Sequence, residues 1–141
     1  MPQELLWIPY TPDDPSTDYK ALAKESGEKF LLCAARARIL HRNTAVFHAR
    51  LGKGRHREAM RAHIHKADEF GRHMSEKLVD PNSLSNKDAS SVYNDIQRRL
   101  AECELSAADA ERNFYHLHNG RGQEALDGAP YPLPNISNLH I

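Results

Sequence analysis

The sequence contains few of the features that mark a secreted or membrane protein. Only two cysteines, Cys33 and Cys103, occur in 141 residues, which is too few for a disulfide framework. No apolar run approaches the roughly 18 residues that a membrane-spanning helix needs. The segment 1–10 carries no basic residues, so it does not resemble a secretory signal. These absences predict a soluble intracellular protein of the cytoplasm or the nucleus.

The chain also has no strand-like alternation of useful length and no glycine-rich phosphate loop. What it does have is 40% apolar and 27% charged residues, a composition typical of a well-solvated folded domain. A chain of this length can bury a core without metals or disulfides. The composition therefore predicts one globular domain.

Three long segments show apolar residues in steps of three and four, at about 16–51, 55–79 and 86–118. This spacing places each apolar row on one side of an α-helix. Gly52-Lys53-Gly54 ends the first helix, because glycine favours the position after a helix. Asp80-Pro81 ends the second. Short connections between long helices favour antiparallel neighbours, so the sequence predicts an all-α, up-down-up bundle with coiled-coil-like packing.

The first of these helices carries two neighbouring apolar rows. One row is Phe30, Cys33, Ala37, Leu40, Thr44, Phe47 and Leu51, and the second is Leu32, Ala35, Ile39, Val46 and Ala49. Together they predict a broad buried stripe, which is wider than two neighbouring helices require. A second chain that buries the excess would explain it, so we expect a homo-oligomer or a subunit of a complex. Both cysteines fall on the predicted seams, where cysteine behaves as a small buried hydrophobe.

The two ends of the chain differ from the predicted bundle. Residues 1–15 hold four prolines, which favour an extended arm over a helix. Residues 119–141 hold three more and predict an irregular tail. The apolar side chains of the arm are expected to bind the bundle or a partner protein, and these candidate partner-binding residues are Leu5, Leu6, Trp7, Ile8 and Tyr10.

Charge is distributed unevenly although the net charge is zero. Residues 34–66 contain nine lysines and arginines and one acid, whereas both flanking regions are acidic. A basic helical hairpin could bind the phosphates of RNA, DNA or another polyanion. Alternatively, the acidic regions could neutralise it within the bundle. The candidate polyanion-binding residues are Arg36, Arg38, Arg42, Arg50, Lys53, Arg55, Arg57, Arg61 and Lys66.

The sequence contains nine histidines, but their spacing does not favour a metal site. His63-Ile64-His65 and His116-Leu117-His118 have a spacing that suits a strand, but on a helix residues two apart point in different directions. His65, Glu69 and His73 share a helical face, but cationic residues flank them and no fourth ligand is evident. We therefore predict no metal site and no cofactor.

One short segment resembles a known motif. Ala62-His63-Ile64-His65-Lys66 is similar to the motif of the histidine-phosphotransfer domains, which are helical bundles of comparable size. That resemblance implies that His63 accepts a phosphoryl group and that Lys66, one helical turn away, helps to neutralise it. The family has glycine after the lysine, where this chain has Ala67.

No arrangement of residues in the sequence indicates nucleophilic or acid–base catalysis, so we expect a protein that is not an enzyme. The interpretation we favour is a protein–protein interaction or assembly subunit that acts through its helix seams and its apolar arm. Binding of RNA, DNA or another polyanion by the hairpin 34–66 is the first alternative. Histidine phosphotransfer at His63 is the second.

Overall fold

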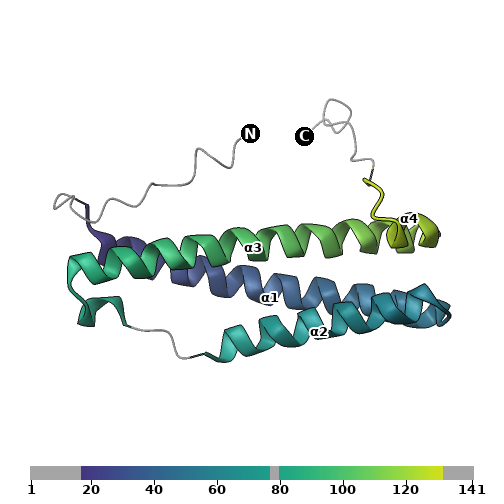
Figure 1. The fold of residues 1–141 in the computed structure, drawn as a ribbon, viewed down its shortest axis with the longest axis horizontal. Coiled ribbons are helices and arrows are strands. Elements are labelled where there is room, and N and C mark those ends of the chain that lie inside the picture. The colour runs from purple at the N-terminus through teal and green to yellow at the C-terminus, as the bar shows by residue number, and fades with distance from the viewer. Residues whose placement is uncertain (1–16, 77–79, 132–141) are drawn as a thin grey trace.

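The computed structural model describes residues 17–76 and 80–131, and in these ranges the chain is helical without a strand (Figure 1). Three long helices, α1 (Tyr19–Leu51), α2 (Arg55–Ser75) and α3 (Asn86–His118), run up, down and up. A short 3₁₀ turn, η2 (Pro81–Ser83), precedes α3, and a five-residue helix, α4 (Gly122–Leu126), follows it. The predicted all-α bundle of three long helices is confirmed.

The ends of the helices follow local capping chemistry. The carboxylate of Asp18 caps α1 by accepting from the backbone N–H of Ala21, so the helix begins slightly later than the predicted residue 16. Ser85 caps α3 in the same way through the N–H of Asp88. Gly52 ends α1 with φ +64°, a left-handed conformation that glycine adopts without strain.

The first helix is the centre of the bundle, because it packs against both α2 and α3 along its length (Figure 1). A core of Phe30, Phe70 and Ile96 joins all three helices, and small residues such as Ala34 and Ala107 let the backbones approach closely. At the other end of the core, Tyr19 packs against Tyr93 at 6.0 Å between ring centroids. The core is therefore built from a few aromatic rings and many small side chains.

The region after α3 is more regular than the sequence predicted. Residues 119–141 were expected to be irregular, but α4 lies within them and packs against the end of the bundle. Two side chains of α3 hold the following segment: Nε2 of His116 contacts the carbonyl of Ala129 at 2.9 Å, and Arg112 donates to the same carbonyl at 3.1 Å. Gly120 and Gly128, both with positive φ, allow the turns on either side of α4.

No helix in the described ranges is both long enough and apolar enough to cross a bilayer. The apolar arm 1–15, with its candidate residues Leu5 to Tyr10, lies outside the described residues, as does the end of the tail after residue 131.

Candidate interaction surface

The outer side of α1 exposes an apolar row. Helix α1 turns Ala34, Ala37 and Thr44 inward, and Leu32, Ile39 and Val46 follow one another at seven-residue intervals on the opposite side. Their side chains are 74%, 58% and 50% exposed. The bundle supplies α1 with only two neighbouring helices, and the second apolar row faces away from both, in keeping with a stripe wider than two neighbours require. Burial of this row by a second chain stays a prediction. We call the row formed by Leu32, Ile39 and Val46 the outer stripe.

Charged side chains mark the two ends of the outer stripe. Glu28 lies one turn before Leu32 and is exposed. Arg50 lies one turn after Val46, and Lys53 lies in the turn that follows α1; both are exposed as well. At its start, exposed Lys24 and Lys29 accompany Glu25 and Glu28, so the outer side of α1 carries both signs of charge there and only basic charges at its end, with an apolar stretch between.

The basic tract is only partly neutralised by the bundle. Arg36 pairs with Glu111 of α3 at 2.9 Å, Arg55 with Asp127 at 3.2 Å, and Lys66 with Glu69 at 3.3 Å. Within residues 17–76 and 80–131, none of the other six takes part in an ion pair, although Arg50 lies over the ring of Phe47. These six exposed residues are Arg38, Arg42, Arg50, Lys53, Arg57 and Arg61. The third helix therefore masks Arg36 and leaves most of the tract accessible.

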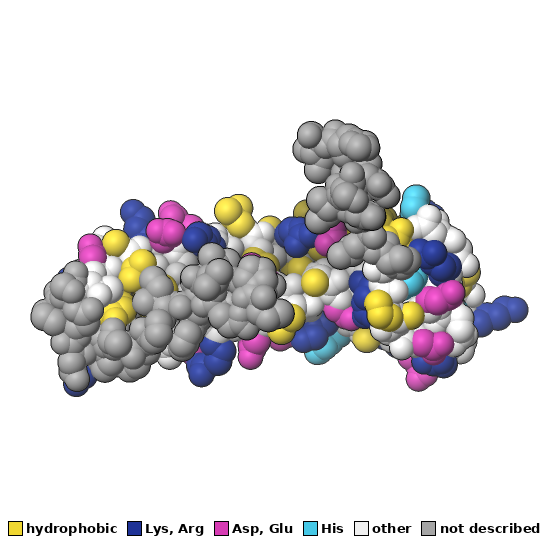
Figure 2. Space-filling view, turned by 90° about the horizontal axis from the view of Figure 1, so that it is seen from above, with side chains coloured by type: hydrophobic (Ala, Val, Ile, Leu, Met, Phe, Trp, Pro, Cys, Tyr) yellow, Lys and Arg dark blue, Asp and Glu magenta, His cyan; other side chains and the backbone are white. Residues whose placement is uncertain are grey.

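The face seen from the side of α3 has a different character (Figure 2). Lysines and arginines alternate there with aspartates and glutamates, and the hydrophobic side chains among them are scattered. Arg98 and Arg112 of α3 pair within the helix, with Asp95 and Asp109 respectively. Opposite charges that alternate over a surface are typical of a solvated face.

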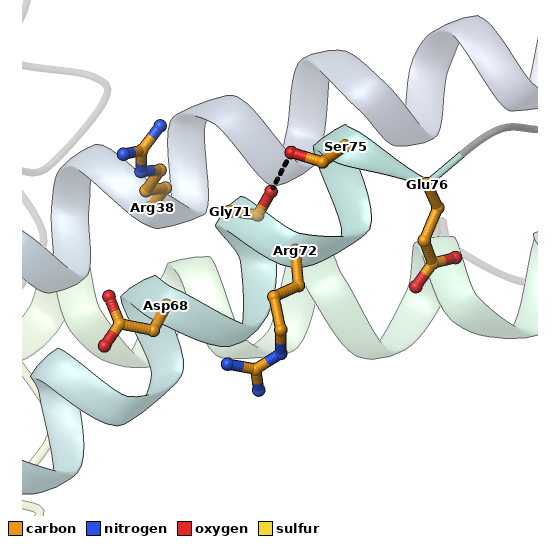
Figure 3. A pocket seen from close by; sticks show the side chains of 6 residues that line it. All are labelled: Arg38, Asp68, Gly71, Arg72, Ser75 and Glu76. Atoms are coloured by element: carbon orange, nitrogen blue, oxygen red, sulfur yellow. Dashed lines mark hydrogen bonds between the residues drawn. The ribbon is translucent and has the colours of Figure 1, made fainter.

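A shallow depression lies between α1 and α2 (Figure 3). Arg38 packs over Gly71, and Ser75 donates to the Gly71 carbonyl at 3.2 Å. The other lining residues are Asp68, Arg72 and Glu76. The lining contains two arginines and two carboxylates, and in Figure 3 their side chains point in different directions and do not converge on one point. The depression is therefore a mixed-charge surface and not an enclosed pocket for a small ligand.

Four histidines pack along the seam between α1 and α2. On α1 they are His41 and His48, and on α2 His56 and His63. The Nδ1 atoms of His41 and His63 are 2.8 Å apart, those of His48 and His56 are 2.9 Å apart, and the rings of His48 and His63 stack at 5.6 Å. Ser106 of α3 contacts Nε2 of His41 at 2.8 Å. We call these four residues the histidine seam.

His41, His48 and His63 of the histidine seam have lowered pKa values. Burial, followed by the neighbouring His63 and His56, lowers the pKa of His48 to about 4. Burial, followed by the charge of His41, lowers the pKa of His63 to about 4. Burial also lowers the pKa of His41, although Asp109 opposes this effect. Each Nδ1–Nδ1 contact needs one nitrogen without a proton, so the geometry and the pKa values agree.

The histidine seam was not predicted, although the sequence contains a signal for it. Among the histidines of each helix is one pair seven residues apart, His41 and His48 on α1 and His56 and His63 on α2, and the two pairs lie symmetrically about Gly52. In an antiparallel helical hairpin such residues meet across the seam. The resemblance to the histidine-phosphotransfer motif implied that His63 accepts a phosphoryl group. Its side chain is only 7% exposed and its Nδ1 is in contact with His41, so the structure gives this alternative no support.

The two cysteines meet in the seam between α1 and α3. Cys103 is buried and Cys33 is half-buried, and neither forms a disulfide. Burial raises the pKa of the Cys103 thiol well above its usual value, and a hydrogen bond with Cys33 raises it further. A thiol of this kind carries no thiolate at neutral pH, so it is not a nucleophile.

No set of three or more potential ligands within the described ranges is arranged to hold a metal ion. Comparison with known proteins adds no assignment: no family model matches the sequence, and no curated protein or solved structure matches it significantly. The most distinctive part of the described surface is the outer stripe with its charged ends.

Proposed function

We propose that this protein is a helical assembly subunit that binds an amphipathic partner helix along the outer side of α1. The observation that carries the proposal is the exposure of Leu32, Ile39 and Val46 at heptad spacing. Scattered surface hydrophobics are common in proteins, but a straight row at seven-residue spacing is the pattern that two paired helices share.

The charges beside the outer stripe describe the partner. Arg42 and Arg50 are exposed next to Ile39 and Val46, and no ion pair within the described ranges engages them. A partner helix with its own apolar row and with carboxylates beside that row would bury the stripe and pair with these guanidinium groups. A helix with basic flanks would be repelled.

The experiment uses two designed helical peptides with the same apolar heptads, one flanked by glutamates and the other by lysines. Fluorescence anisotropy measures the binding of each labelled peptide to the full chain. We expect the glutamate peptide to bind and the lysine peptide to bind at least tenfold more weakly at low salt. Leu32→Gln should weaken binding of the glutamate peptide.

Leu105 provides a matched control, because it is also 74% exposed but lies on α3 away from the outer stripe. Leu105→Gln should leave binding unchanged. If neither peptide binds, or if both leucine substitutions have the same effect, the outer stripe is not a helix-binding surface and the proposal is wrong.

Binding of a polyanion is a second candidate, supported by the six cations that no ion pair neutralises. A labelled single-stranded RNA would bind at roughly 50 mM salt and lose most of its affinity at roughly 200 mM, because binding releases counterions. Arg57→Gln with Arg61→Gln, on α2, should weaken the binding, whereas Arg36→Gln should not, since Glu111 already pairs with Arg36. No binding at low salt would rule this candidate out.

A further inference from the structure

The outer side of α1 carries two neighbouring rows of apolar and charged residues. The pattern of these rows is complementary to the same pattern on a second copy of the helix. One row, at seven-residue spacing, is Glu25, Leu32, Ile39 and Val46, and Lys53 follows it in the turn after α1. The neighbouring row is Glu28, Ala35, Arg42 and Ala49. In both rows the acidic residue comes first and apolar residues follow, with Arg42 at the centre of the second row. The outer side of α1 therefore has, in Glu28, a carboxylate for the basic residues at its own end, Arg50 and Lys53.

We propose that the partner helix is α1 of a second copy, paired antiparallel about a two-fold axis that passes between Ile39 and Arg42. This inference rests on the proposed function and names the partner for the same surface. A two-fold axis is the usual symmetry of a homodimer, and it uses the same patch on both subunits.

The antiparallel direction follows from the charges. In this register Glu28 of one copy lies opposite Lys53 of the other, and the two-fold axis repeats the contact at the far end of the pair. Glu28 has no ion pair with any residue of the described ranges, and Lys53 has none either. Glu25 already pairs with Lys29 at 3.0 Å, so Glu28 is the available carboxylate. A parallel pair would place Glu28 beside Glu28 and Lys53 beside Lys53, which like charges disfavour.

The register follows from the sizes of the side chains. When Glu28 faces Lys53, Leu32 faces Ala49 and Ala35 faces Val46, so that a large apolar residue meets a small one in each layer. At the centre Ile39 faces Arg42, whose aliphatic stem can cover it while the guanidinium remains in water. A shift by one heptad would put Leu32 opposite Arg42 and would separate the charged ends.

The outer side of α1 is free of its own bundle, as the 74% exposure of Leu32 shows. The helical part of the paired stretch, from Glu28 to the end of α1 at Leu51, spans about 35 Å at a rise of about 1.5 Å per residue. A contact made by one helix from each copy is small compared with obligate dimer interfaces, so we expect a dissociation constant in the micromolar range, on the order of 1–50 µM.

Charge reversal tests both the partner and the direction. Sedimentation velocity on the full chain at roughly 50 mM salt would measure the monomer–dimer equilibrium, with circular dichroism as the check on folding. Each single reversal, Glu28→Lys and Lys53→Glu, should weaken the dimer about tenfold, because each spoils two symmetric contacts. The double variant should return to within about threefold of the wild type, because the opposite charges meet again.

The apolar centre has its own control pair. Ile39 lies beside the axis and is changed in both copies, so Ile39→Gln should abolish the dimer. Leu105→Gln should have no effect on the dimer. If the double reversal fails to restore the dimer, the antiparallel register is wrong.

Monomeric protein at about 100 µM, a concentration well above the expected dissociation constant, would overturn the second-copy inference. If that monomer still binds the glutamate peptide through Leu32, a different chain is the partner and the proposed function stands. If the monomer binds neither peptide, the outer stripe is not a helix-binding surface, and both proposals are wrong.

Discussion

His41 and His63 meet across the seam between α1 and α2, with their Nδ1 atoms 2.8 Å apart. One of the two nitrogens has to donate a proton and the other has to accept it, so at least one ring must be neutral. Protonation of both rings would place two N–H groups against each other in a buried site. The hairpin that carries the basic tract and the outer stripe is therefore tied to the protonation state of its histidines.

The stability of the bundle should fall as the pH falls from about 7 to about 4.5. His48 and His63 have pKa values of about 4 in the folded protein, whereas an unfolded histidine titrates near 6.5. Between these values the unfolded chain binds more protons, so acid favours unfolding, and the stabilisation is complete only above pH 6.5. We expect a loss of roughly 2–4 kcal/mol between pH 7 and pH 5, allowing for coupling between the rings.

Urea unfolding followed by circular dichroism at pH 7.5, 6.0 and 5.0 measures this loss. A stability that is constant over this range would show that His48 and His63 are not held neutral by the fold.

Removal of one ring should be more costly than removal of its exposed neighbour. His63→Ala leaves the Nδ1 of His41 without its partner in a buried site and also opens a cavity, which should cost about 2–4 kcal/mol. His65→Ala, two residues further along the same helix, removes an exposed side chain and should change stability by less than about 0.5 kcal/mol. Urea unfolding at pH 7.5 compares the two variants, and equal effects would contradict the position assigned to His63.

Two glycines should respond to alanine in opposite ways. At Gly71, inside α2, the new methyl group would make ordinary contact with the Arg38 side chain, at 3.5 Å from its Nε atom. Gly71→Ala should therefore stabilise the protein by about 0.5–1 kcal/mol, the usual gain in a helix interior. At Gly122 the methyl group would lie 3.1 Å from Cε1 of His56 and 3.4 Å from Leu51.

Gly122→Ala should cost about 1 kcal/mol, because it forces α4 away from the hairpin tip or moves the His56 ring. Thermal melting at neutral pH measures both variants. A stabilising Gly122→Ala would mean that α4 does not pack closely on His56.

Cys103 should be protected from alkylation in the folded protein. Its thiol is buried and its raised pKa suppresses the thiolate, which is the reactive form. Mass spectrometry after iodoacetamide treatment at pH 8 should show labelling of Cys103 only when denaturant is added. Labelling at a rate similar to that of a free thiol in native buffer would contradict this position.

The helices could be predicted because their signals are local. Steps of three and four, the glycines at 52 and 54, and the cap at Ser85 depend on residues close in sequence, and short connections then allow little besides an up-down-up bundle. Even so, the start of α1 was predicted slightly before its cap at Asp18. Helix α4 was not predicted, because a five-residue helix has too few residues to show a period.

The sequence alone determined that α1 has more apolar surface than a three-helix bundle requires. Only the tertiary structure decided which row is buried, because that depends on how closely the helices approach. Alanines and Thr44 face inward and permit close packing, and the larger Leu32, Ile39 and Val46 are left outside. Histidines were counted as polar in the sequence, yet His41 and His48 are buried. A partner ring across the seam satisfies each of them, and that contact exists only once the hairpin has folded.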